Sequence, residues 1–210
     1  MIDLYTWSTP NGRKVSIMLE EVGLPYQVHS INITKDEQHT PDFLKISPNN
    51  RIPAIVDQDN GIALFESGAI LMYLAEKTGK LWPQDGDTKW RVMEWLMWQM
   101  GGVGPMLGQV HHFVKYNNGR SQYSEERYSK EGRRLYGVLD KRLADHEYVA
   151  GDYSIADIAI WPWISRFEWQ EIDLNEYPNV LRWYKAIAAR PAVVKGYHVP
   201  VEQPGIPIPA

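Results

Sequence analysis

The feature of this sequence that most constrains its fold is a change of pattern near residue 79. Before that point, stretches of alternating apolar residues are interleaved with stretches of helical spacing, whereas afterwards only helical spacing recurs. The intervening stretch GKLWPQDGD (79–87) combines glycine, proline and acidic residues without a regular period, as interdomain linkers do. We therefore predict two domains, residues 1–79 and 88–210, joined by a linker at 80–87.

The first domain is expected to contain both strands and helices. Ile2 and Leu4 indicate a first strand, and a helical pattern beginning near Gly12 follows it. A second strand is expected at 27–33, and the apolar runs at 51–57 and 62–67 are separated by a hairpin-type turn. With a helical turn within 40–50 and a helix from Glu66 to Thr78, the predicted order is βαβ-α-ββα.

The second domain reads as all-α. Helical patterns cover 88–101, 105–113, 125–143, 155–169 and 179–190. Three glycines and a proline in GGVGP (101–105) predict a kink or a break there, which would leave a concave face. Ser154 and Asp157 have the spacing of a capping box, with Tyr153 and Ile158 placed as a hydrophobic staple. The proline-rich end, 199–210, predicts an extended tail.

Composition excludes several classes of function. The formal net charge is −4, and the basic residues are scattered, so we expect no nucleic-acid partner. Neither a signal-peptide pattern nor a run of about 18 apolar residues is present, which favours a cytoplasmic protein without a membrane partner. The chain has no cysteine, so sulfur redox chemistry would need a thiol from a bound small molecule.

The turn STPNGRK (8–14) lies where a strand-turn-helix unit often carries a redox Cys-x-x-Cys pair. Here the hydroxyl of Thr9, the amide of Asn11 and the backbone N–H groups around Asn11 and Gly12 are potential hydrogen-bond donors. A thiol with a pKa near 8.5 is only about 3% ionised at pH 7, and lowering that pKa by two units needs about 2.7 kcal/mol. A few hydrogen bonds and a helix N-terminus can supply this stabilisation. Helix capping is the alternative role for Thr9 or Asn11.

Four motifs together resemble the cytosolic glutathione transferase family: NNRIPAIVD, FESGAILMYLAEK, SIAD and YPNVLRWYKAIAARPAV. The segments TPNG, ISPNNRIPAIVD, GGVGPMLGQVHHF and YSIADIAIWPW are similar to the Nu class of that family, the glutathione-dependent disulfide-bond oxidoreductases. The resemblance spans residues 1 to about 195. It implies α/β plus all-α architecture, with a thioredoxin-like N-terminal domain followed by an all-helical C-terminal domain, in a homodimer.

The resemblance also implies a binding site for glutathione as co-substrate. It places a cis peptide at Ile52-Pro53, whose exposed Ile52 backbone would pair with the cysteinyl unit. Glu66 would take the ammonium group of the γ-glutamyl unit and Ser67 its carboxylate. Gln38 and Arg51 would lie near the tripeptide, and Arg127 would reach it from a partner subunit. From the residues alone, a trans Pro53, an ordinary helix cap at Glu66 and Ser67, and a solvent-facing Arg127 remain open.

Family members activate glutathione with Tyr, Ser or Cys near this first turn. Thr9 and Asn11 are ranked above Tyr5 as the catalytic pair, because strand alternation turns Tyr5 away from the face of Leu4. Tyr5 is then expected in the core. No metal is expected, because His111 and His112 are adjacent and point about 100° apart on a helix.

The function implied is reduction of a small-molecule or protein disulfide by thiol-disulfide exchange with a bound glutathione thiolate. Conjugation of glutathione to electrophiles, or reduction of organic hydroperoxides, is an alternative that uses the same thiolate. A non-catalytic glutathione-binding regulatory protein is an alternative of a different class.

Overall fold

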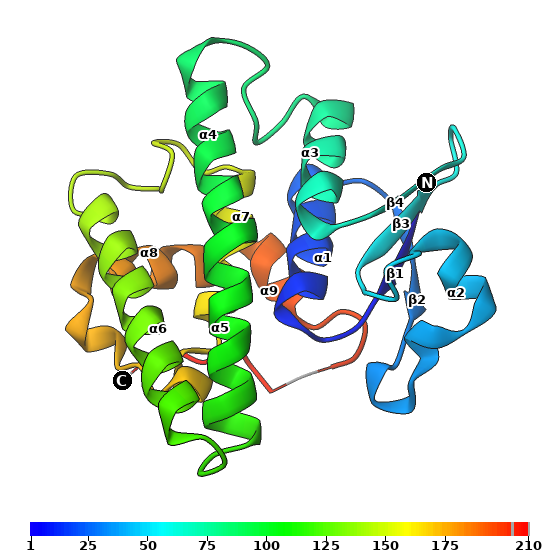
Figure 1. The fold of residues 1–210 in the computed structure, drawn as a ribbon. Helices are drawn as coiled ribbons and strands as arrows, with labels where there is room; N and C mark the ends of the chain where they lie inside the picture. The colour runs from blue at the N-terminus through cyan, green and yellow to red at the C-terminus, as the bar shows by residue number, and fades with distance from the viewer. Residues whose placement is uncertain (203, 210) are drawn as a thin grey trace. The chain divides into compact units, whose positions relative to one another are not determined.

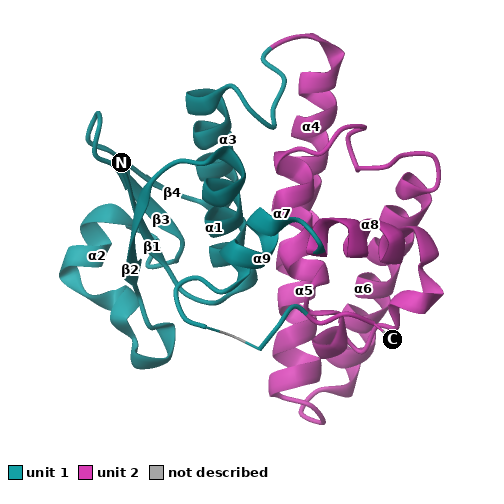
Figure 2. Ribbon diagram, turned by 180° about the vertical axis from the view of Figure 1, so that it is seen from behind, with its two compact units in different colours: residues 1–84, 189–206 teal, residues 85–188, 207–210 magenta. Residues whose placement is uncertain are grey.

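The computed structural model describes residues 1–202 and 204–209, which form two compact units (Figure 2). Unit 1 comprises residues 1–84 together with 189–206, and unit 2 comprises 85–188 together with the chain end from 207. This division assigns 189–206 to the first unit, whereas the domain limits expected from the sequence assign them to the second. Those limits remain a prediction.

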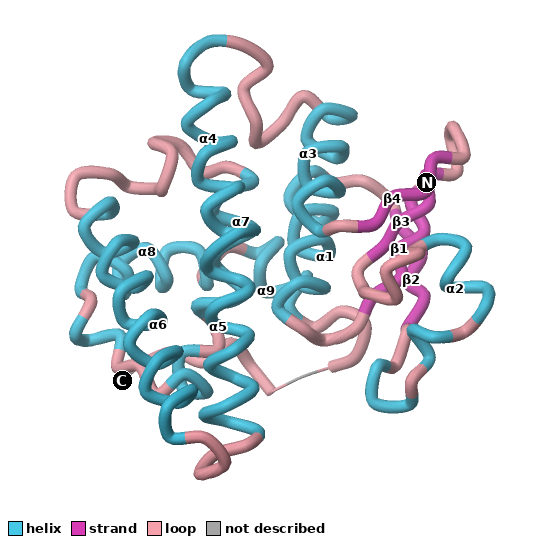
Figure 3. The backbone as a smooth tube through the Cα atoms, viewed as in Figure 1, coloured by secondary structure: helices cyan, strands magenta, loops and turns pink. Residues whose placement is uncertain are grey.

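A four-stranded sheet forms the centre of unit 1, with strands β1 (Ile2–Thr6), β2 (Tyr26–Ser30), β3 (Ala54–Asp57) and β4 (Ile62–Phe65). The strand order is β2-β1-β3-β4; β1 and β2 are parallel, and the other two pairs are antiparallel (Figure 3). The expected strand at 27–33 ends early, because the Asn32 side chain accepts the Thr34 N–H and starts a 3₁₀ turn.

The helices of unit 1 are α1 (Pro10–Val22), α2 (Pro41–Ile46), α3 (Ser67–Thr78) and α9 (Pro191–Tyr197). Helices α1 and α3 lie on one side of the sheet and α2 on the other (Figure 1). The core between sheet and helices includes Leu4, Val15, Met18, Ile55, Ile70 and Leu71, all fully buried. The expected order βαβ-α-ββα is therefore confirmed. Helix α9 was not expected from the sequence.

Helix α9 packs closely against α1, although it is remote in sequence. A Cβ placed on Gly196 would lie 2.7 Å from the Cα atom of Ile17, so only glycine permits this approach. Ser16 Oγ donates to the Gly196 carbonyl at 2.7 Å. The Arg13 guanidinium lies 3.6 Å from the centre of the Tyr197 ring and Arg13 Nε donates to the Tyr197 carbonyl. The contact is therefore both tight and polar.

Unit 2 is helical, with α4 (Gly86–Trp98), α5 (Gly104–Val110), α6 (Gln122–Leu143), α7 (Ile155–Ile164) and α8 (Pro178–Ala188). Of the kink or break expected at 101–105, the break is wrong, because the backbone stays helical there, and the kink remains a prediction. Helical backbone continues through π-helical turns at Gln99–Val103 and His111–Tyr116, which absorb the glycines without interrupting the helix. The helix expected over 155–169 ends at Ile164, and a 3₁₀ turn, Phe167–Gln170, follows.

The capping box at the start of α7 is confirmed. Ser154 Oγ accepts the Ala156 N–H, while the Asp157 carboxylate accepts the Ser154 N–H. Asp157 is fully buried and also accepts from the Val149 N–H and the Trp183 indole, so the cap joins three segments.

The proline-rich tail has neither helix nor strand at 199–202 and 204–209, as expected, whereas positions 203 and 210 lie outside the described residues. Across the part of the chain that the structure describes, every helix is too short or too polar to cross a membrane.

Candidate functional site

Sheet register brings the expected site segments to one end of unit 1. Tyr5 of β1 pairs with Ala54, the first residue of β3, and Ala54 pairs with Phe65, the last residue of β4. The segments that follow β1, precede β3 and follow β4 therefore lie at the same end of the sheet. The parallel strand β2 also ends there, because Ser30 pairs with Thr6. The turns carrying Thr9, Asn11, Ile52, Pro53, Glu66 and Ser67 all belong to these segments.

Thr9 is the N-cap of α1, and its Oγ1 accepts the Gly12 N–H at 3.1 Å. The Gly12 N–H was expected as a donor to the thiolate, but the cap uses it instead. A threonine hydroxyl that accepts one hydrogen bond still carries its own hydrogen for donation. Asn11 occupies the second helical position, at the positive end of the helix dipole. The cap role and the donor role of Thr9 are therefore compatible.

Gly12 allows the chain to fold back tightly at this turn. A Cβ on Gly12 would overlap the Trp7 carbonyl oxygen and lie 2.5 Å from Thr6 Oγ1. The end of β1 and the first turn of α1 are thus in direct contact, with no room for a side chain between them. This contact holds the first turn of α1, which carries Thr9 and Asn11, close to the end of β1.

The peptide bond between Ile52 and Pro53 is cis, which confirms the expectation drawn from the resemblance. Pro53 is buried, whereas Ile52 is partly exposed and Arg51 is exposed. Ser47 Oγ donates to the Arg51 carbonyl at 2.8 Å and anchors the loop before this bond. The backbone of Ile52 therefore lies on a loop held from α2 and leading directly into β3.

Glu66, between β4 and α3, has a φ of 68° and is the N-cap residue, with no side-chain capping bond. This left-handed φ is uncommon for residues other than glycine and marks a constrained turn. Ser67 is the first residue of α3 and is buried, while Glu66 is exposed. The helix N-terminus is thus suited to a carboxylate, and the exposed Glu66 side chain to an ammonium group.

Lys14 is a member of this site that the sequence analysis missed. Its side chain is fully buried, and Nζ donates to Ser67 Oγ at 3.2 Å. Burial lowers the pKa of Lys14 to about 7, and the negative charge of Glu66 opposes that shift. A basic residue within the pattern GRK looks solvated in sequence, so no local signal distinguished it.

Two buried acceptors occur in loops of unit 1. Among the described residues, Gln38 Oε1 and Asn50 Oδ1 have no hydrogen-bond partner. Gln38 lies in a 3₁₀ turn, Glu37–His39, and Asn50 directly precedes Arg51. Each can accept an N–H from a ligand amide.

Tyr5 lies away from the first turn of α1. Its ring stacks on His29 at 4.6 Å between centroids and also contacts Phe43 of α2, on the opposite side of the sheet from α1. It is partly exposed, so the expected core position holds only in part. Burial, with a contribution from Asp3, raises the pKa of Tyr5, which makes it harder to ionise.

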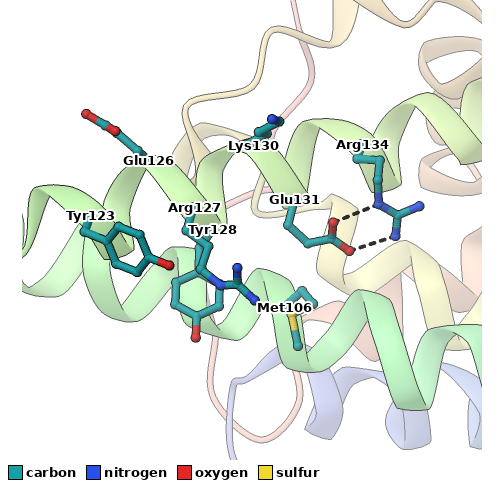
Figure 4. Close-up of a pocket in the computed structure, with 8 residues that line it drawn as sticks. All are labelled: Met106, Tyr123, Glu126, Arg127, Tyr128, Lys130, Glu131 and Arg134. Carbon is teal, nitrogen blue, oxygen red and sulfur yellow. Dashed lines mark hydrogen bonds and ion pairs between the residues drawn. The ribbon is translucent and has the colours of Figure 1, made fainter.

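Arg127 belongs to unit 2, where it lines a groove of about 720 Å³ along α6 (Figure 4). Within the described part of the chain, its guanidinium makes no ion pair or hydrogen bond, whereas neighbouring Arg134 binds Glu131 through two contacts of 2.7 Å. Arg134, and more weakly Arg127, lower the pKa of Glu131. Met106 of α5 and the α6 residues Tyr123, Glu126, Tyr128 and Lys130 complete the lining.

His111 is buried within unit 2, where it stacks on Trp163 at 5.6 Å. Its Nε2 lies 3.0 Å from Gln170 Nε2. In the described residues, no group of three or more His, Cys, Asp or Glu side chains is arranged to hold a metal ion. His111 is thus part of a polar network inside the helical unit.

Known proteins with similar sequences cover nearly the whole chain. The disulfide-bond oxidoreductase YfcG of Escherichia coli is 50% identical over 91% of this chain and 92% of its own length. The disulfide-bond oxidoreductase YghU of the same organism is 41% identical over 93% of this chain and 73% of its own length.

Solved structures agree in fold. A glutathione transferase from Burkholderia graminis, with two glutathione molecules bound per subunit, has a TM-score of 0.90 and 46% identity, covering 95% of this chain and 88% of that one. A glutathione transferase from Pseudomonas putida, with one glutathione disulfide bound per subunit, has a TM-score of 0.90 and 44% identity, covering 95% and 91%.

Family models describe both parts of the sequence. The N-terminal domain of glutathione S-transferases matches residues 1–76, and the C-terminal domain matches residues 104–191. Together with the identity to YfcG over 91% of the chain, these matches show that the protein belongs to the glutathione S-transferase family.

Proposed function

We propose that this protein is a glutathione-dependent disulfide-bond reductase of the Nu class, acting through a glutathione thiolate bound at the first turn of α1. The observation that carries the proposal is the geometry of that turn in a chain without cysteine. Thr9 and Asn11 lie at the N-terminus of a 13-residue helix, and the sulfur has to come from the ligand. Similarity to the disulfide-bond oxidoreductases YfcG and YghU supports the proposal. The similar structure from Pseudomonas putida, which has glutathione disulfide bound, supports it as well.

The residues at this end of the sheet bind chemically different parts of the tripeptide. Thr9 Oγ1 and the Asn11 amide donate to the thiolate, and the Ile52 backbone pairs with the cysteinyl unit. Glu66 and Ser67 hold the γ-glutamyl end. Gln38 and Arg51 lie toward the glycyl end, where the unpartnered Gln38 Oε1 can accept an N–H and the Arg51 charge can face a carboxylate.

The reaction is two successive thiol-disulfide exchanges. The bound glutathione thiolate attacks one sulfur of the substrate disulfide, forming a mixed disulfide and releasing a thiolate that takes a proton from water. A second glutathione thiolate then attacks the glutathione sulfur of the mixed disulfide. Glutathione disulfide and the second substrate thiol leave. The substrate gains two electrons, and two glutathione molecules together lose them.

A homodimer completes the proposed site, with Arg127 reaching glutathione in the partner subunit. The position of Arg127 in an open groove supports this, because within the described residues its guanidinium forms no direct ion pair and can face an anionic ligand. We also propose that the protein is cytoplasmic, as expected from its sequence.

Parallel assays test the activity. Initial rates are measured with glutathione and, separately, an aliphatic disulfide, an aryl halide and an organic hydroperoxide. We expect the disulfide to be reduced fastest. Faster conjugation of the aryl halide would favour the transferase alternative, and tight glutathione binding without any turnover would favour the regulatory one.

A further inference from the structure

Lys14, like its neighbour Arg13, is a basic residue buried inside unit 1. Its side chain has no exposed surface, although it carries an ammonium group on the first turns of α1. Burying a charge is unfavourable unless nearby groups compensate it. Its contact with Ser67 Oγ, at 3.2 Å, places that charge directly behind the first residue of α3.

We propose that Lys14 is a positioning residue for glutathione, acting through Ser67 to select the α-carboxylate of the γ-glutamyl unit. The inference deepens the proposed function and rests on it.

The hydrogen bond between Lys14 and Ser67 supports this role. An ammonium group can only donate, so Ser67 Oγ must use a lone pair toward Lys14. The hydroxyl hydrogen of Ser67 is then directed away from Lys14. Lys14 therefore sets the orientation in which Ser67 meets a carboxylate.

The positive charge around Ser67 also favours a carboxylate ligand. The N-terminus of α3 already carries a partial positive charge, and the protonated form of Lys14 adds a positive charge on the protein side of Ser67. Glu66 favours the charged form of Lys14, and a bound carboxylate would act in the same direction. Because the site is buried, this interaction is screened less than one at the surface.

The test uses glutathione and 4-aminobutyryl-cysteinylglycine, which lacks only the α-carboxylate of the γ-glutamyl unit. Binding of both is measured by calorimetry to the wild type, Lys14→Met and Lys80→Met. The Lys80 side chain is a control in the same unit: it donates to the Val22 carbonyl and follows the C-terminal end of α3, whereas Ser67 begins that helix. KM for glutathione and kcat with a disulfide are measured for all three.

Wild type and Lys80→Met should prefer glutathione over the analogue by about 100-fold, as expected for a charge-assisted contact. In Lys14→Met, glutathione binding should weaken by about 10-fold to 100-fold, while analogue binding changes by less than about 3-fold. KM should rise and kcat should stay within about 3-fold, because Thr9 and Asn11 still hold the thiolate. A merely structural role would weaken both ligands equally.

If Lys14→Met does not fold, Lys14→Gln removes the charge with a polar side chain and is measured in the same way. Wild type that binds no glutathione would overturn both the proposed function and this inference. Wild type that binds glutathione, with the full preference over the analogue retained in the Lys14 variant, would overturn the inference alone.

Discussion

The Nε2 atoms of Gln170 and His111 lie 3.0 Å apart inside the helical unit, and the other contacts of Gln170 fix the direction of this hydrogen bond. Gln170 Nε2 also donates to the Trp163 carbonyl, and Gln170 Oε1 accepts from Tyr136 Oη. The Gln170 amide is thus oriented as a donor to His111, whose Nε2 has to be unprotonated. Burial, aided by the charge of Arg166, accordingly lowers the pKa of His111 to about 4.

This pKa predicts acid sensitivity. Between about pH 4 and 6.5 the unfolded chain protonates this histidine and the native state does not, so stability falls as pH is lowered through that window. The loss should reach up to about 3 kcal/mol. It is measured by urea unfolding at pH 7, 5.5 and 4.5, as the difference between wild type and His111→Gln.

The exposed neighbour supplies the control, since His112→Gln should keep the wild-type dependence on pH. Burial raises the pKa of Asp157 to about 6, which changes stability in the opposite direction, but this contribution is common to all three proteins and cancels in the difference. Equal acid sensitivity in wild type and His111→Gln would show that His111 takes up its proton over the same pH range in the native and unfolded states.

Thiolate stabilisation at the first turn of α1 is tested at Asn11. Asn11→Ala should raise the pKa of bound glutathione by about one unit and lower kcat/KM with a small disulfide by about 10-fold or more, because one charge-assisted hydrogen bond is lost. The thiol pKa is followed by thiolate absorbance against pH. Asn118→Ala, in an exposed loop, should leave both quantities unchanged. Unchanged turnover in Asn11→Ala would remove Asn11 from the mechanism.

Thr9 permits a matched pair of substitutions. Thr9→Val removes the hydroxyl that caps Gly12 and should cost about 1 kcal/mol of stability as well as activity. Thr9→Ser keeps the hydroxyl. Its activity should stay within about 3-fold of the wild type, and its free energy of unfolding within about 0.5 kcal/mol. Stability is measured by urea unfolding and activity with the same disulfide. Loss of stability without loss of activity in Thr9→Val would leave Thr9 with the cap role alone.

Gly12 is predicted to be intolerant of any side chain. Gly12→Ala should destabilise the protein by about 3 kcal/mol, because the added carbon overlaps the Trp7 carbonyl and Thr6. Gly137→Ala is the matched control: this glycine lies within α6, an added methyl group would have no atom within 4 Å, and the change should stabilise by up to about 1 kcal/mol. Chemical unfolding of both variants checks the pair, and a fully stable Gly12→Ala would contradict the close contact.

Complementation between subunits tests the proposed role of Arg127. Arg127→Ala and Asn11→Ala should each be impaired, yet a refolded equal mixture should recover about one quarter of wild-type activity. Half of the dimers would be mixed, and each would contain one site with Asn11 from one chain and Arg127 from the other. Lys130→Ala, which changes another cation of the same groove, should retain activity without mixing. No recovery in the mixture would mean that Arg127 does not act across subunits.

Much of the fold could be predicted from sequence because its signals are local. The alternation of Ile2 and Leu4, the helical spacing after Gly12 and the Ser154–Asp157 cap each depend on residues close in the chain. Continuity through GGVGP could not be predicted in this way. Glycine and proline usually interrupt helices, but here packing within the unit retains a π-helical backbone.

The sequence by itself determined the order of strands and helices in the first 78 residues, the need for an external thiol, and the turn that carries Thr9 and Asn11, because composition and short-range periodicity are properties of the chain. Only the tertiary structure decided which charged side chains lie inside. Arg13 and Lys14 look like solvated residues in GRK, yet one packs on Tyr197, which is 184 residues away, and the other lies behind Ser67. Burial depends on contacts between distant segments, and such contacts leave no periodic mark on either segment alone.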